Sequence, residues 1–239
     1  MRGWRAARLA VPLALSLAGM AAMGSVDHAC AADTGPGVDT ALVLSVDVSD
    51  SVDETRFRLQ MQGIAEALED PSVERAILAG PRGAILLMLV EWADKPSVAV
   101  PWMRIGSIED ARRAAARIRN TPRRTGDFTC VAQMFRFVTD KVVATLTVPA
   151  DRLVVDVSGD GRENCNPAVP TPAARDALVA SGAQINGLPI LEGDEAATLK
   201  AWYEKNVMGG EGAFVLPALG FQDFGRAFRQ KFITEISMR

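Results

Sequence analysis

Short polar side chains stand at a few points of this sequence, and their oxygen atoms are suited to bind a hard metal ion. Asp47, Ser49 and Ser51 alternate along one stretch. Thr129 stands in a second stretch, and Asp160 precedes a glycine in a third. The Asp-x-Ser-x-Ser spacing lets a turning loop bring alternate side chains to one point. Hydroxyls and carboxylates without His or Cys favour Mg²⁺, our first choice, with Mn²⁺ and Ca²⁺ as alternatives.

Composition excludes several other chemistries. The chain has 239 residues, of which 49% are hydrophobic and 23% charged, and its net charge is −3. This balance is typical of a folded domain, and it argues against a nucleic-acid partner, which would require a basic surface. The single histidine, His28, falls in a segment that export would remove. We therefore exclude nucleophiles that depend on an imidazole base, and also histidine-ligated zinc.

The N-terminus has the three parts of a secretory signal. Residues 1–8 contain arginines and no acidic residue, residues 9–23 form an apolar run, and residues 29–31 match an A-x-A cleavage site. The apolar run is too short for a comfortable membrane span. We expect residues 1–31 to be a signal peptide and 32–40 a polar leader. The mature protein would then be periplasmic or secreted, without a membrane span.

The rest of the chain alternates between strand and helix patterns. Apolar runs bounded by turns predict strands over 41–49, 83–93, 96–105, 151–161, 183–191 and 212–219, the last at a sheet edge. Apolar residues at helical spacing predict helices over 54–69, 107–120, 130–146, 171–182, 195–207 and 221–236. This alternation predicts an α/β fold with a doubly wound, mainly parallel sheet and helices on both faces, as one domain over 41–236.

The predicted topology places the candidate ligands together. In an open parallel sheet, ligands bind at the carboxyl ends of the strands. Asp47 and the two serines leave the first strand, Asp160 ends the strand over 151–161, and Thr129 stands just before the helix over 130–146. We therefore expect one metal site at this edge of the sheet.

These residues resemble the metal-ion-dependent adhesion site of von Willebrand factor A domains. The pattern of that family is Asp-x-Ser-x-Ser after the first strand, a threonine in a later loop and Asp-Gly after the fourth strand. It falls on Asp47, Ser49, Ser51, Thr129 and Asp160. The resemblance extends over 41–236. The pairs Glu91-Trp92 and Pro101-Trp102 further resemble a bacterial family of exported von Willebrand A-like proteins that carries an unknown-function label.

The resemblance implies roles for the ligands. In the family, the serines and the threonine bind the metal directly, while the aspartates act through water or hold the serines. One metal position stays open for an acidic group of the partner. Two departures occur here: Asp127-Phe128 precede Thr129 in place of glycines, so Thr125 is an alternative ligand, and Cys130 follows Thr129 directly.

The second departure predicts a disulfide. Only Cys130 and Cys165 survive removal of the signal, and two thiols in an exported chain usually pair. Cys165 follows Asp160 by five residues, so the topology brings both cysteines to the same sheet edge. We expect a Cys130–Cys165 disulfide at the rim of the site, the alternative being two unpaired core thiols.

Other prominent residues have ordinary structural interpretations. We expect Trp92 and Trp102 to be core or strand-pair residues, and Glu91 to be a solvated charge at a strand edge. The arginines between 112 and 124 are interpreted as a solvated face. The phenylalanines spaced along 221–236 predict that the last helix docks on the sheet.

Two functions of different classes remain. The first is an exported, non-enzymatic binding module that holds a divalent cation and engages an Asp or Glu of a protein partner. The second is a metal-dependent hydrolase, such as a phosphatase with Asp47 as nucleophile. Its sequence support is weak, because haloacid-dehalogenase-like phosphatases need an aspartate where this chain has Ser49. A structural envelope protein with a vestigial site is a further alternative.

Overall fold

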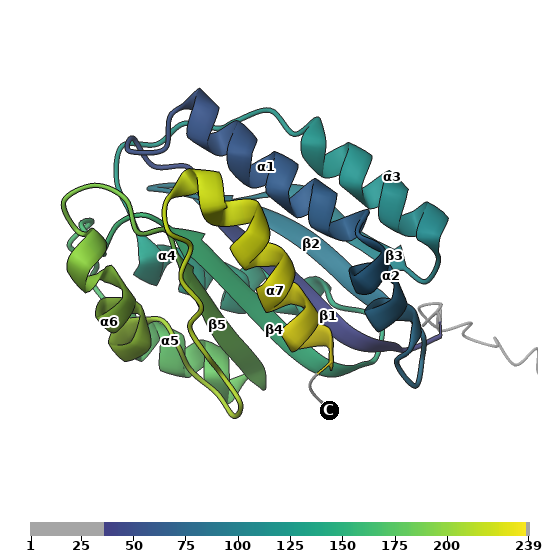
Figure 1. The fold of residues 1–239 in the computed structure, drawn as a ribbon. Helices are drawn as coiled ribbons and strands as arrows, with labels where there is room; N and C mark the ends of the chain where they lie inside the picture. Colours follow the sequence, from purple (N-terminus) through teal and green to yellow (C-terminus); the bar gives the residue numbers. More distant parts are fainter. Residues whose placement is uncertain (1–35, 238–239) are drawn as a thin grey trace, which may run out of the picture. The chain divides into compact units, whose positions relative to one another are not determined.

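A computed structural model describes residues 36–237, which form a sheet with helices on both faces (Figure 1). The expected signal peptide, residues 1–31, lies outside the described residues. The strands are β1 (Val38–Asp47), β2 (Ile85–Trp92), β3 (Ser97–Ile105), β4 (Ala150–Gly159) and β5 (Ala183–Pro189). The helices are α1 (Glu54–Leu68), α2 (Pro71–Leu78), α3 (Ile108–Arg119), α4 (Val131–Phe137), α5 (Thr171–Ala180), α6 (Ala196–Asn206) and α7 (Phe224–Ser237).

The sheet has the order β3-β2-β1-β4-β5 and is parallel except at β3, which runs antiparallel to β2. This confirms the α/β, doubly wound architecture. The central strand β1 is almost entirely buried because both of its neighbours and both layers of helices cover it. That burial explains why its sequence is apolar nearly throughout.

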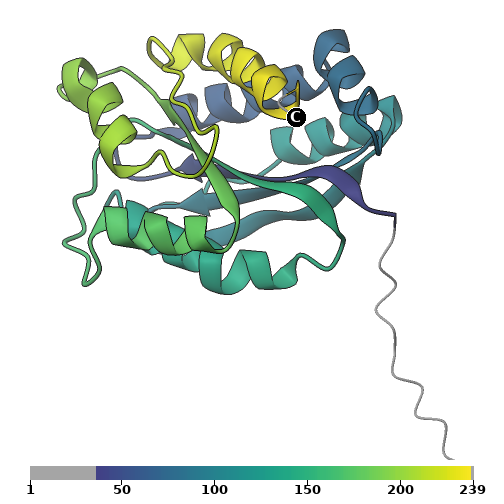
Figure 2. The same cartoon turned by 90° about the horizontal axis from the view of Figure 1, so that it is seen from below.

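Two hydrophobic cores lie on opposite faces of the sheet. Leu42 and Leu44 of β1 face the layer of α1, α3 and α7, whereas Val43 faces the layer of α4 and α5. Figure 2 shows these layers above and below the sheet. Trp92 is fully buried in the second core and Trp102 packs against it half-buried, as expected. Phe224, Phe228 and Phe232 of α7, and Phe221 in the 3₁₀ turn just before it, are buried in the first core, as predicted.

Several elements differ from the sequence-based predictions. Helix α2 was not expected, although Asp70 before Pro71 is an N-cap signal and its side chain accepts from the Ser72 backbone N–H at 2.8 Å. The helix predicted over 130–146 is α-helical only to Phe137 and continues as a π-helical and then a 3₁₀ segment. Strand β1 begins at Val38, so the end of the expected leader belongs to the sheet.

The edge strand predicted over 212–219 is wrong. This segment runs beside β5 and meets the sheet region only in isolated parallel bridges, Gly187 with Val215 and Ile190 with Ala218. The Leu216 and Ala218 N–H groups donate to the Gly187 and Pro189 carbonyls, but Pro189 of β5 has no backbone N–H to donate in return, so a continuous ladder is interrupted there.

No helix within residues 36–237 combines the length and the apolar character that crossing a membrane requires.

Candidate metal centre

The site begins where β1 ends. Asp47 is fully buried, and its Oδ1 accepts a hydrogen bond from the Ser49 backbone N–H at 2.8 Å. This local bond turns the chain, so that the hydroxyls of Ser49 and Ser51 lie 3.4 Å apart. Asp53 then caps α1 by accepting from the Arg56 backbone N–H, which ends the turn. The Asp-x-Ser-x-Ser spacing therefore does bring alternate side chains to one place.

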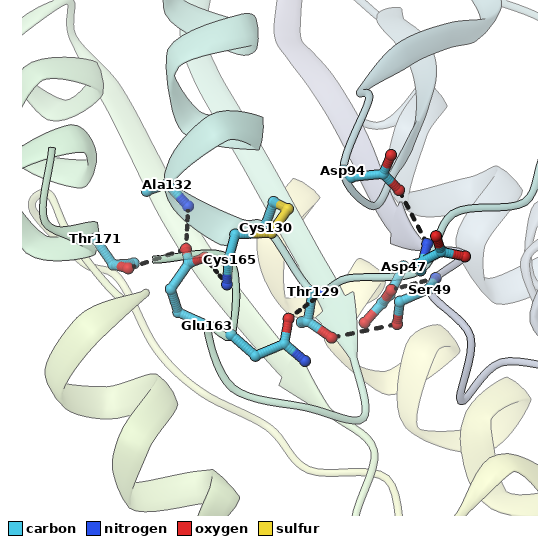
Figure 3. The surroundings of a disulfide bond; sticks show 11 residues. Asp47, Ser49, Asp94, Thr129, Cys130, Ala132, Glu163, Cys165 and Thr171 are labelled. Atoms are coloured by element: carbon cyan, nitrogen blue, oxygen red, sulfur yellow. Dashed lines mark hydrogen bonds between the residues drawn. A yellow bond between two sulfur atoms is a disulfide. The ribbon is translucent and has the colours of Figure 1, made fainter. Parts of the chain in front are cut away.

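Two distant segments complete the group. The Thr129 hydroxyl donates to Ser49 Oγ at 3.3 Å, and the Ser51 hydroxyl donates to Asp160 Oδ1 at 2.7 Å. Thr129 stands before α4 and Asp160 follows β4, the parallel neighbour of β1. All five residues predicted from the sequence thus lie together; Figure 3 shows Asp47, Ser49 and Thr129. Thr125, the alternative to Thr129, is exposed on the preceding loop.

The second oxygen of Asp47 is left without a partner. Asp47 Oδ2 and the Tyr203 hydroxyl are both buried, and neither has a hydrogen-bond partner within the part of the chain that the structure describes. A Cβ at Gly159 would lie 2.8 Å from Asp47 Oδ2 and 2.9 Å from the Tyr203 oxygen, so only glycine fits. Burial, and then the charge of Asp160, raise the pKa of Asp47 to about 7. A nearby cation would offset both effects.

The donor set fits a hard divalent cation. Three hydroxyls and two carboxylates offer only oxygen atoms as ligands. Burial raises the pKa of Asp160 as well, whereas the hydrogen bond from Ser51 lowers it.

The sulfur atoms of Cys130 and Cys165 and a Glu163 carboxylate oxygen also lie close enough to hold an ion. However, the two cysteines form a disulfide with their Cα atoms 5.2 Å apart. The predicted Cys130–Cys165 pairing is confirmed, so these sulfurs are not free thiolates.

Two arginines at the site were missed by the sequence interpretation. Arg123, expected on a solvated face, is half-buried, and its Nη2 donates to the carbonyls of Val48 and Ser49, each at 3.3 Å. Arg56 of α1 donates to the Ser51 carbonyl at 2.5 Å and to Glu192 at 2.8 Å. Both arginines hold the backbone of the serine loop. No local pattern indicates these contacts, because the partner of Arg123 is about 75 residues away.

Glu91 corrects another expectation. It is not a solvated edge charge: its side chain is 1% exposed, and Arg124 lies 3.9 Å from it. The reason is that β3 forms the sheet edge, so β2 is an interior strand. Burial raises the pKa of Glu91 to about 7, against the opposing influence of Arg124 and Arg123.

A hollow of about 290 Å³ opens beside the hydroxyls. Ser51, Thr129 and Asp160 line it together with charged residues of the facing loops, among them Arg56, Arg162, Glu192 and Glu195. Asp47 is not among the lining residues. Phe128, just before Thr129, is 52% exposed. The site is therefore an open, charged depression with Ser51 and Thr129 at its wall and the buried Ser49 and Asp47 outside the lining.

The fold and this arrangement of residues define a von Willebrand factor A-like domain. Proximal thread matrix protein 1 from the mussel byssus, solved with zinc in its MIDAS motif, is 16% identical with a TM-score of 0.64, covering 84% of this chain and 49% of that one. A von Willebrand factor type A protein from Catenulispora acidiphila is 14% identical with a TM-score of 0.54, covering 84% and 43%. The pilus adhesin SpaC from Lactobacillus rhamnosus GG is 13% identical with a TM-score of 0.56, covering 85% and 30%.

The chain thus spans about half or less of the length of these proteins, and at such identities the likeness shows the fold. Within this class, the chain belongs to the family described as "Protein of unknown function (DUF1194)", whose model matches residues 37–239. No curated protein matches the sequence.

Proposed function

We propose that this protein is a non-enzymatic binding module that holds a divalent cation and uses it to engage an Asp or Glu of a protein partner. Mg²⁺ is the proposed ion, with Mn²⁺ and Ca²⁺ as alternatives. The observation that carries the proposal is the cluster of Ser49, Ser51 and Thr129 hydroxyls next to the buried Asp47, whose Oδ1 accepts from the Ser49 N–H and whose Oδ2 has no partner. A buried carboxylate that keeps an unpartnered oxygen and adjoins three hydroxyls favours a cation, because burying its charge without one is costly.

The residues divide into two roles in this proposal. The three hydroxyls would hold the ion directly. Asp47 holds the Ser49 backbone and Asp160 holds the Ser51 hydroxyl, so both carboxylates orient the hydroxyls and neutralise the ion's charge. When bound, the cation would offer a coordination position to a partner's carboxylate from the side of the hollow.

Two observations support binding in preference to hydrolysis. Asp47 is fully buried and does not line the hollow, so its carboxylate is poorly placed to attack a substrate there. Residues 36–237 contain no histidine to act as a general base. Turnover of a generic phosphate ester that is lost in Asp47→Asn would contradict this part of the proposal.

We also propose that the protein is exported. The support is the expected signal peptide at 1–31 together with the Cys130–Cys165 disulfide, because such bonds persist in oxidising compartments.

The test is thermal unfolding with chelator and with graded Mg²⁺, Mn²⁺ and Ca²⁺. An ion that binds only the folded state adds about 2.7 kcal/mol at one hundred times its Kd. For a domain of this size, we expect Tm to rise by roughly 5–10 °C. Asp47→Asn should abolish the rise, while Asp176→Asn, an exposed carboxylate on α5, should keep it. No rise with any ion up to millimolar concentration, or an equal rise in Asp47→Asn, would overturn the metal site.

A further inference from the structure

Three consecutive residues fasten the segment that carries Thr129. Glu163 Oε2 accepts from the Ala132 backbone N–H at 2.7 Å, and Cys165 is bonded to Cys130. Asn164 makes a reciprocal pair: its Oδ1 accepts from the Thr129 N–H at 2.7 Å, and its own N–H donates to the Thr129 carbonyl at 3.1 Å. Figure 3 shows Thr129, Ala132 and Glu163 around the Cys130–Cys165 disulfide. Residues 163–165 are called the clasp below.

The clasp supplies the N-terminal cap that the sequence at the start of α4 lacks. Cys130, at the N-cap of α4, makes no side-chain capping bond, so Glu163 supplies the acceptor for the first turn of that helix. The loop over 121–128 has no regular secondary structure. The loop is tied at Asp127, whose N–H donates to Asp94 Oδ1 at 3.0 Å, but both backbone hydrogen bonds of Thr129 itself go to Asn164 in the loop after β4.

The clasp also connects two of the candidate ligands. It begins three residues after Asp160, so it ties the Asp160 loop to the segment that begins at Thr129. Between them, a Cβ at Gly161 would lie 3.3 Å from the Thr129 hydroxyl, which shows how closely the two segments approach. The Thr129 hydroxyl is thereby directed at Ser49 Oγ.

We infer that the clasp is the positioning device of the cation site, and that its disulfide sets the affinity for the ion. This inference rests on the proposed function. Without the disulfide, the backbone of Thr129 and Cys130 is less restricted. Binding of the ion must then order these residues, and the entropy that they lose lowers the affinity for the ion. The hydroxyls of Ser49 and Ser51 lie on the other loop and keep their positions through Asp47 and Asp160.

The first experiment changes only the disulfide. Two electrons and two protons convert the S–S bond to two thiols; a water-soluble phosphine supplies the electrons and becomes its oxide with the oxygen of one water molecule. Mn²⁺ is the probe, with free ion measured by its paramagnetic resonance signal. We expect the Kd of the reduced protein to be about tenfold higher or more, and reoxidation to restore it. Circular dichroism checks that the reduced protein is folded.

The second experiment leaves the disulfide intact. Asn164→Ala removes the acceptor for the Thr129 N–H and should raise the Mn²⁺ Kd several-fold. Asn206→Ala is the matched control, because the Asn206 side chain likewise makes one hydrogen bond to the backbone, donating to the Trp202 carbonyl, but stands at the end of α6. A merely structural role would lower Tm in chelator without changing the Kd. This variant keeps the inference testable if the reduced protein unfolds.

The outcomes separate the inference from the function on which it rests. If the oxidised protein binds Mn²⁺ and neither reduction nor Asn164→Ala changes the Kd, the clasp inference is overturned and the metal site stands. If the oxidised protein binds no ion, both are overturned. Weaker binding in the reduced protein and in Asn164→Ala, with Asn206→Ala unchanged, supports both.

Discussion

Glu91 is a carboxylate in the interior whose charge is only partly compensated. Arg124 lies 3.9 Å away, yet neither Glu91 oxygen has a hydrogen-bond partner within residues 36–237. Burial raises the pKa from 4.5 to about 7, so the folded protein holds this proton more tightly than the unfolded chain does. The free energy of unfolding therefore falls as pH rises from about 4.5 to about 7, and stays reduced above that range.

Glu91→Gln should remove this pH dependence. Relative to the original protein, we expect the variant to gain about 3 kcal/mol between pH 4.5 and pH 8, because each unit by which the pKa is raised corresponds to about 1.4 kcal/mol. Urea unfolding at both pH values measures the difference. The control is Glu109→Gln, since that side chain is 83% exposed on α3. Parallel pH profiles for Glu91→Gln and the original protein would show that Glu91 does not titrate in this range.

At the scale of elements, α7 docks on the sheet through charge as well as through its phenylalanines. Lys231 is fully buried and lies 2.6 Å from Asp156 of β4, and it also pairs with Glu235 one turn later. Asn186 of β5 donates to Glu235 at 2.7 Å. Burial raises the pKa of both carboxyl groups, against the opposing charge of Lys231. The Lys231 ammonium group therefore forms ion pairs with two buried carboxylates.

Lys231→Met should remove the ammonium group that compensates both carboxylates, although Arg152 still acts on Glu235. We expect a loss of roughly 3–5 kcal/mol in the free energy of unfolding, measured in urea at pH 8. Adding Glu235→Gln to Lys231→Met should recover part of the loss, because one buried charge is then removed. Lys200→Met is the control, as Lys200 makes its ion pair on the surface of α6. A loss below about 1 kcal/mol would mean that the cluster does not depend on the lysine.

At the scale of the whole molecule, the disulfide closes a long stretch of chain. Cys130 and Cys165 are 35 residues apart, and β4 lies between them. In the chain-entropy model, a loop of this length contributes about 3–4 kcal/mol by restricting the unfolded chain, although calorimetric data favour an enthalpic account. The same bond that orders the site should therefore also stabilise the fold.

Cys130→Ser combined with Cys165→Ser should lower Tm by roughly 10 °C in chelator, where no cation contributes. Differential scanning calorimetry measures the shift, and far-UV circular dichroism at 25 °C should be unchanged. The original protein treated with the phosphine should shift by a similar amount. A Tm equal to that of the oxidised protein would contradict a stabilising role.

Local sequence determines much of this protein. The alternation of apolar runs and helical spacing predicts the sheet and most helices, because each element buries a face whose period is set by its own geometry. The ligand candidates were found for a related reason: parallel strands place their carboxyl ends at one edge, so Asp47, Thr129 and Asp160 had to approach one another. The Cys130–Cys165 pairing follows from the same topology.

Tertiary structure decides what depends on residues far apart in the chain. The burial of Glu91 depends on β3 taking the sheet edge, and the contacts of Arg123 and Arg56 join segments with no common local pattern. The sequence 212–219 has strand character, but Pro189 of the neighbouring β5 has no N–H to donate to it, so the ladder is interrupted. The hydrogen bonds of the clasp are likewise invisible in sequence, although its disulfide is not: Glu163 accepts from a helix that begins more than thirty residues earlier, and Asn164 holds Thr129 just before that helix. Local sequence thus selects the elements and the ligand types, whereas packing determines which charges are buried and what holds the ligands in place.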